Sequence, residues 1–100
     1  MIDEKKRQLS DYFKKKNVIK AILFGSHARG TPSRRSDYDL IVIQKTDKRF
    51  FDRYDYFNDL YELLDDRLDL LIYTPEEWES IRDRIFFRKI LDDAETIHVG

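Results

Sequence analysis

Two stretches of the sequence decide the fold: VIKAILFGS at residues 18–26 and, after ten further residues, DYDLIVI at residues 37–43. The first is apolar except for one lysine up to its Gly-Ser end, which is typical of a strand interior to a sheet. The second begins with two aspartates and then becomes apolar, which predicts a strand from Asp37 or Tyr38 to about Gln44. The sequence therefore predicts two strands joined through a Gly-Ser turn and a polar loop.

The segment between these strands has the residue types of an anion-binding turn. Ser26 is a good N-cap for a short helical turn over residues 27–29, which Gly30 would close. Residues 31–36 contain a proline, two serines and two arginines and are predicted to form a loop. Backbone N–H groups and the Ser26 hydroxyl can face an anion, assisted by the helix dipole. Gly25 has no side chain to keep phosphate oxygens away from the backbone.

Two further helices are indicated by apolar spacing. One is predicted over the first seventeen residues, with Asn17 as its stop signal. Its apolar residues fall roughly on one helical face: Ile2, Leu9, Tyr12 and Phe13. The other follows the second strand and is expected to be capped by Asp47, because apolar residues recur at spacings of three and four. These residues are Phe50, Phe51, Tyr54, Phe57, Leu60, Tyr61 and Leu64.

The last third of the chain predicts a strand, a long helix and a short terminal strand. The first strand spans Leu68 to Tyr73, and TPEE at residues 74–77 is a strong helix start, with Glu77 completing a capping box. The inner face of this helix is expected to hold Trp78, Ile81 and Ile85. The terminal strand is expected at Thr96–Val99. This element order predicts an α/β fold, a small mixed β-sheet with helices packed on it.

Length and composition exclude several classes of protein. One hundred residues match a single domain, residues 1–100, and 14% aromatics with recurring apolar runs argue against disorder. The net charge of −1 provides no general basic field for nonspecific nucleic-acid binding. The absence of cysteine excludes disulfides and thiolate zinc sites. No apolar run is long enough to span a bilayer or act as a secretory signal, so the expectation is a cytoplasmic domain without a membrane partner.

Three aspartates are candidate metal ligands. Asp37 and Asp39 are two residues apart on a strand, so their carboxylates project from the same face. Such a pair repels unless a cation lies between, and hard oxygen ligands suit Mg²⁺. Asp69 can complete a three-carboxylate site if its strand pairs beside that of Asp37; Asp65 and Asp66 are rivals, although they belong to the end of the preceding helix. Three carboxylates can hold two metal ions, and Asp69 is then also a candidate general base.

The basic residues near these motifs leave alternatives open. Arg29 can contact a phosphate, or it can balance the helix dipole or pair with a carboxylate. Arg34 and Arg35 can reach a triphosphate or form a solvated loop. His27 and His98 are expected at the surface, because a hard Mg²⁺ site has no need of imidazole. The segment is not a phosphate-binding P-loop, because its second glycine is not followed by lysine and serine or threonine.

FGSHARG at residues 24–30 with SDYDL at residues 36–40 resembles the signature of minimal nucleotidyltransferases, or MNT proteins, of the DNA polymerase β-like superfamily. The resemblance spans nearly the whole chain and implies that superfamily's fold. It implies that Gly25, Ser26 and Arg29 bind a nucleoside triphosphate. It also implies that Mg²⁺, as two ions, is held by the catalytic residues, which are Asp37, Asp39 and Asp69.

Many MNT proteins are antitoxins encoded beside HEPN-domain toxins, and the family is reported to adenylylate a tyrosine of the toxin. The resemblance thus implies AMP transfer from ATP to a hydroxyl of a HEPN partner, with release of pyrophosphate, within a hetero-oligomer. Nothing else in the sequence forms an obvious acceptor pocket, which fits an acceptor supplied by a partner. The alternative is a non-catalytic antitoxin that neutralises the HEPN toxin by complex formation.

The two long helices predicted after residue 47 contain more apolar residues than one narrow helical stripe can hold. The residues concerned are Phe51, Tyr54, Tyr56, Phe57, Tyr61, Phe86, Phe87, Ile90 and Leu91. Some are expected to form an exposed patch of the kind that marks protein interfaces; the alternative is a wide core in a small domain.

Overall fold

The computed structural model describes residues 4–33 and 35–100, so the predictions for Ile2 and Arg34 lie outside the described residues. Its centre is a four-stranded sheet with the strand order β3-β2-β1-β4. β1 (Lys20–Phe24) pairs antiparallel with β2 (Tyr38–Ile43) and with β4 (Glu95–Val99), whereas β3 (Leu68–Tyr73) pairs parallel with β2. The predicted mixed sheet and the interior position of β1 are confirmed.

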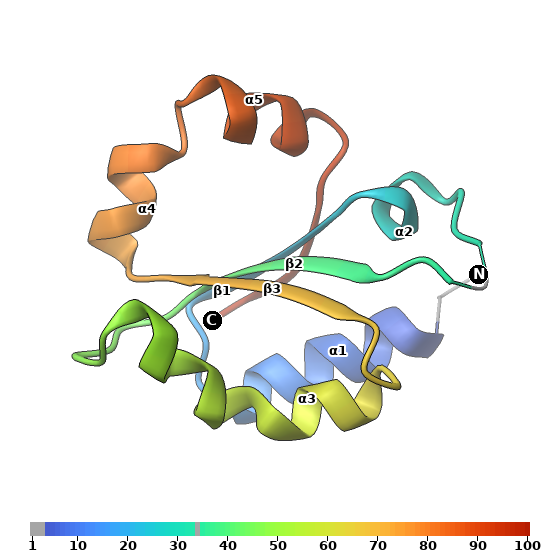
Figure 1. Ribbon diagram of the computed structural model, residues 1–100, viewed down its shortest axis with the longest axis horizontal. Coiled ribbons are helices and arrows are strands. Elements are labelled where there is room, and N and C mark those ends of the chain that lie inside the picture. The colour runs from blue at the N-terminus through green and yellow to red at the C-terminus, as the bar shows by residue number, and fades with distance from the viewer. Residues whose placement is uncertain (1–3, 34) are drawn as a thin grey trace.

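Helices cover both faces of this sheet (Figure 1). One face is covered by α1 (Glu4–Lys15), the 3₁₀-helix η1 (Phe50–Phe57) and α3 (Asn58–Leu63). The opposite face is covered by α4 (Pro75–Ile81) and α5 (Ile85–Asp92). The short helix α2 (Ser26–Arg29) lies at the end of β1. None of the helices in the described part of the chain is long and apolar enough to cross a membrane.

Strand alternation divides the core into two clusters. Leu40 and Val42 of β2 pack with the helices α1 and α3, and Ile41 and Ile43 pack on the other face around Trp78. The larger cluster lies on the α1 and α3 face and contains Leu9, Phe13, Val18, Ala21, Leu23, Leu40, Val42, Phe57, Leu60, Leu64, Leu70 and Ile72. Asp39, two residues before Ile41, is thereby directed to the α4 and α5 face.

Several predicted start and stop signals are confirmed. Asn17 follows the end of α1 in a left-handed conformation with φ 58°, and Gly30 closes α2 with φ 76°. The Thr74 side chain accepts a hydrogen bond from the Glu77 N–H at 3.2 Å, and the Glu77 carboxylate accepts one from the Thr74 N–H at 2.8 Å. These signals depend on a few neighbouring residues, and tertiary packing leaves them intact.

Two cap predictions are wrong. Ser26 is the first residue of α2 and not its cap; Gly25 occupies the cap position. The segment after β2 begins as the 3₁₀-helix η1 without a side-chain cap, so Asp47 does not cap it. Of the apolar residues predicted for this segment, Phe57 is fully buried whereas Phe51 is 84% exposed, so they do not all lie on one inner face.

The predicted long helix after residue 74 is two helices. Arg84 adopts an extended conformation with φ −66° and ψ 148°, which ends the helical phase of α4 before α5 begins. Ile85 is therefore 71% exposed and not on the inner face, whereas Phe87 is buried. The break lets Phe87 pack edge-on against Trp78, with ring centroids 5.5 Å apart.

Candidate functional site

The candidate site begins where β1 ends and the chain turns into α2. Gly25 has φ 76° and ψ −158°, a combination that residues with a side chain rarely adopt. A Cβ atom at Gly25 would also overlap the Oδ2 atom of Asp39. This contact follows from the register, in which Phe24 pairs with Asp39. Backbone conformation and close approach both require glycine, and together they place the turn directly against the Asp39 carboxylate.

The parallel pairing of β2 with β3 brings two of the predicted acids side by side. Asp39 and Asp69 are direct Cα partners in this register. Paired residues on adjacent strands point to the same face, which here is the face of α4 and α5. Asp37 immediately precedes β2 and is exposed. Asp69 was predicted as the third acid on the condition that its strand pairs beside the strand of Asp37. This condition is met.

The electrostatics of Asp39 show how close these charges are. Burial raises the pKa of the Asp39 carboxyl, and the negative charges of Asp69 and Asp37 raise it further. His27 and Arg29 oppose this shift, since positive charge near Asp39 lowers its pKa. The ionised form of Asp39 is thus disfavoured by its own surroundings, and a bound cation would relieve that penalty.

The chemistry of the donor set fits a hard divalent cation. The three side chains offer carboxylate oxygens only, which suit Mg²⁺ and leave positions for water and phosphate oxygens. Among residues 4–33 and 35–100, no three His, Asp or Glu side chains are already gathered tightly enough to hold a metal ion. Unscreened carboxylates repel one another, and a cation bound between Asp37, Asp39 and Asp69 would offset that repulsion.

The residues predicted to contact phosphate, and the acids that rival Asp69, differ in burial and in position. Ser26 is half-buried at the start of α2, and Arg29 is exposed yet acts electrostatically on Asp39. A helix of four residues has a weak macrodipole, so an anion here would depend on N–H groups and the serine hydroxyl. Arg35 is exposed in the loop. The rival acids, residues 65–66, lie in a left-handed turn before β3 and outside the strand that carries Asp69.

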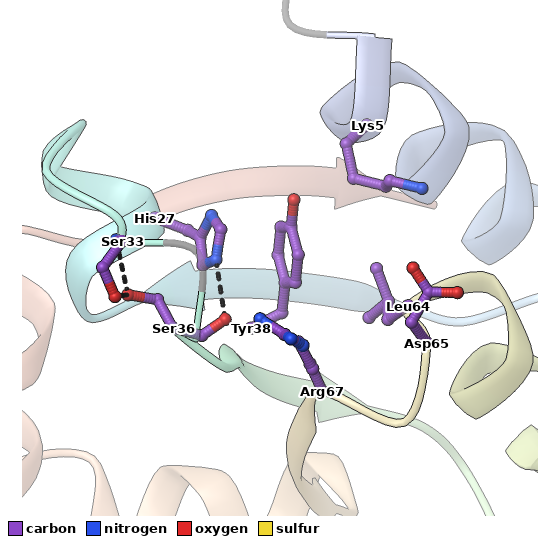
Figure 2. Close-up of a pocket in the computed structure, with 8 residues that line it drawn as sticks. All are labelled: Lys5, His27, Ser33, Ser36, Tyr38, Leu64, Asp65 and Arg67. Atoms are coloured by element: carbon purple, nitrogen blue, oxygen red, sulfur yellow. Dashed lines mark hydrogen bonds between the residues drawn. The ribbon is translucent and has the colours of Figure 1, made fainter.

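Sequence reasoning missed a pair of stacked rings on the opposite side of β2. His27, expected only as a surface residue, is half-buried and lies flat on Tyr38, with ring centroids 3.7 Å apart and planes 12° from parallel (Figure 2). The pair lines a cavity of about 450 Å³ together with Lys5, Ser33, Ser36, Leu64, Asp65 and Arg67. His98 is also half-buried, and its Nε2 atom is 2.9 Å from the Val18 carbonyl oxygen. Strand alternation in the sequence predicts that Tyr38 lies opposite Asp39, but nothing local indicates the ring that stacks on it.

Two tyrosines near Asp69 were expected only as residues of the core or of an exposed apolar patch. Burial raises the pKa of Tyr54 and of Tyr61, and the Asp69 charge contributes to both shifts. The Tyr54 hydroxyl donates a hydrogen bond to the Leu70 carbonyl oxygen at 2.8 Å. The charge of Asp69, on the edge strand β3, thus disfavours the ionised form of both tyrosines.

The chain resembles several solved toxin–antitoxin structures. A crystallised toxin–antitoxin with AMP-PNP matches at a TM-score of 0.69 and 18% identity over 95% of this chain and 73% of the other. The tri-AMPylated HEPN toxin of Shewanella oneidensis in complex with MNT antitoxin matches at a TM-score of 0.60 and 14% identity over 96% and 71%. These structural neighbours confirm the predicted fold. No curated protein matches the chain.

A family model supplies the sequence-level evidence. The model described as polymerase beta, nucleotidyltransferase matches residues 7–94 and so includes the Gly-Ser turn, β2 with its two acids and β3 with the third. This match covers most of the chain, independently of the structural likeness. The chain belongs to the polymerase β nucleotidyltransferase family.

Proposed function

We propose that this protein transfers AMP from ATP to a hydroxyl, that of a tyrosine, on a partner HEPN toxin and thereby acts as its antitoxin. The observation that carries this proposal is the pairing of Asp39 with Asp69 on one face of the sheet, beside the turn at Gly25. Structural neighbours that hold AMP-PNP or an AMPylated HEPN toxin supply the substrate and the partner. The cytoplasmic location and the single-domain reading of residues 1–100 stay predictions.

The chain's own residues are assigned roles in an in-line displacement. Gly25 and Ser26 bind the triphosphate through N–H groups and a hydroxyl, with Arg29 as a further phosphate contact. Asp37, Asp39 and Asp69 would hold Mg²⁺, which when bound neutralises phosphate charge and lowers the pKa of the acceptor hydroxyl. Asp69, at the exposed edge, orients that hydroxyl and accepts its proton. The acceptor oxygen forms a bond to the α-phosphorus, the bond to the bridging oxygen breaks, and pyrophosphate leaves.

The test is the mass of the HEPN partner after incubation with this protein, ATP and Mg²⁺. Wild-type protein should add AMP to the partner. Asp39→Asn should lower the rate more than about 100-fold, since loss of a direct ligand exceeds the 10–100-fold cost of an outer-shell change. Asp11→Asn, an equivalent change at an exposed position of α1, should leave the rate unchanged. Undiminished transfer by Asp39→Asn would exclude the assigned metal site.

A second candidate function is neutralisation by binding alone. It is favoured by large apolar side chains that stand exposed on the surface, among them Ile85 and Phe86 of α5. The double variant Asp37→Asn and Asp39→Asn separates the two functions in cells that produce the toxin. If the variant still protects the cells, complex formation is sufficient; if protection is lost while the complex still forms, AMP transfer is required.

A further inference from the structure

The two halves of the candidate site are joined by only a short strand ladder. Pairing between β1 and β2 runs from Lys20 and Ile43 to Phe24 and Asp39, and ends there. Ser26 and Asp37 both lie beyond this last pair. Ten residues separate them in the sequence, and the described ones among these belong to α2 or to the loop after it. The pairing of β1 with β2 therefore does not set the distance from the Gly-Ser turn to the first aspartate.

One side chain spans this gap. The ring of His27, the residue after Ser26, stacks on Tyr38, the residue between the two aspartates. Its Nε2 atom is 3.2 Å from the carbonyl oxygen of Ser36, the residue before Asp37 (Figure 2). A carbonyl oxygen only accepts hydrogen bonds, so the imidazole donates from Nε2.

The residues that His27 contacts are themselves anchored. The Tyr38 N–H donates to the Arg67 carbonyl oxygen at 2.9 Å, which ties the start of β2 to the start of β3. The Tyr38 side chain points away from the face of Asp39. The ring stack therefore contacts β2 on one face, while Asp37 and Asp39 are directed to the other face, where the proposed substrate would bind. Movement of α2 relative to β2 would break the stack and the hydrogen bond together.

We infer that His27 is a positioning residue, which holds the phosphate-binding turn and the Asp37–Asp39 pair at the separation that transfer requires. This inference rests on the proposed function, because the separation matters only if both halves serve one substrate. His27 acts through Ser36 and Tyr38 and from the opposite face of the strand, so it is not assigned contact with the reacting atoms. Misplacement of reacting groups by about 1 Å can cost about 100-fold in rate.

The first measurement uses the protein without nucleotide, metal or partner. In His27→Ala, backbone amide hydrogen exchange should quicken over residues 26–39, whereas exchange in β1 and β3 stays as in wild type. His98→Ala is the matched control, since His98 also donates from Nε2 to a backbone carbonyl oxygen, that of Val18, at 2.9 Å. It should leave exchange over residues 26–39 unchanged. Unaltered exchange in His27→Ala would overturn the inference.

The second measurement separates the two contacts and uses Mg²⁺, ATP and the HEPN partner. His27→Phe keeps the ring stack, His27→Gln keeps a hydrogen-bond donor, and His27→Ala keeps neither. We expect kcat to fall about 10–100-fold in His27→Ala, with partial recovery in the other two and little change in KM for ATP. If Asp39→Asn abolishes transfer but His27→Ala keeps the wild-type kcat, the positioning role of His27 is overturned and the proposed function stands. No transfer by wild-type protein would instead refute the proposed function, and the exchange result would still decide whether His27 holds the turn.

If His27→Ala fails to fold, the single-contact variants decide. His27→Phe and His27→Gln should then be folded, with exchange over residues 26–39 faster than in wild type and kcat reduced. Wild-type exchange and kcat in both would show that neither contact positions the site.

Discussion

The two faces of the sheet share the same strands but differ in what they hold. Among the described residues, twelve buried side chains gather on the face of α1 and α3, against five on the face of α4 and α5. The second face also carries Asp39 and Asp69 at its open end. Alternation along β2 sends Leu40 to the first face and Asp39 to the second. One face therefore supplies most of the burial that stabilises the fold, which leaves part of the other free for charged groups.

Truncation of a large side chain on each face gives the largest expected effect. Phe57→Ala should lower the free energy of unfolding by about 3–5 kcal/mol, because Phe57 is fully buried in the larger cluster. Phe87→Ala should cost about 3 kcal/mol or less, because Phe87 is 8% exposed and its cluster is smaller. Urea unfolding measures both. An equal or greater loss for Phe87→Ala would contradict the assignment of stability to the α1 and α3 face.

An ion pair between a buried arginine and a half-exposed glutamate connects η1 to α4. Arg53 is 6% exposed and makes two hydrogen bonds to the Glu77 carboxylate, at 2.6 and 3.1 Å, and others to the backbone oxygens of Lys48 and Ile72. Arg53→Met should cost about 1–3 kcal/mol, since it leaves carbonyl oxygens without donors while Glu77 is still solvated. Urea unfolding tests this; a stability equal to wild type would show that packing replaces the pair.

The same pair predicts an acid-dependent loss of stability. Hydrogen bonds from Arg53 and Thr74 lower the pKa of Glu77 from 4.5 to about 2. Because the folded-state pKa is depressed, this contribution is complete above pH of about 4.5 and is lost as the pH falls toward 2. The Glu77 side chain is 43% exposed, so solvent weakens the effect. Between pH 4.5 and 2, Tm should fall less steeply with falling pH in Arg53→Met than in wild type. Equal slopes of Tm against pH in the two proteins would contradict the assignment of this acid-dependent loss to the Arg53–Glu77 pair.

The smallest expected effect on stability is that of replacing an acid on the face of α4 and α5. Asp39→Asn, which should abolish transfer, should leave stability within about 0.5 kcal/mol of wild type or raise it slightly. The reason is that burial and neighbouring carboxylates raise the pKa of Asp39, so its ionised form opposes folding at neutral pH. Thermal unfolding at pH 7 without metal measures this change. A marked loss of stability would mean that the carboxylate serves the fold.

Much of the fold could be predicted because local chemistry determined it. The stop at Asn17, the capping box at Thr74 and the closing glycine at Gly30 each depend on a few adjacent residues. The strands were also predictable, since short continuous apolar runs bounded by turn residues are typical of strands interior to a sheet. The family signature pointed to the same three acids that the pairing of β2 with β3 now places near one another, although their catalytic role stays a prediction.

Two of the wrong predictions, both on the helices after residue 47, share one physical cause. The spacing of aromatic residues after residue 47 fits an α-helix, but the chain forms a 3₁₀-helix over residues 50–57. The helix after Thr74 has no internal proline or glycine, yet it breaks at Arg84, and Phe87 packs on Trp78. In both places tertiary packing overrides a weak local preference, and the residues that decide it are distant in the sequence.

Local residue chemistry was enough to specify which segments become strands and helices, where most of them end, and which residues are candidates for binding phosphate and metal. Long-range pairing decided the rest: which strands are neighbours, that Asp69 faces the same way as Asp39, and that His27 lies on Tyr38. The physical reason is that a cap or an apolar run draws its free energy from nearby residues. A register or a ring stack draws it from partners that only the folded chain brings together.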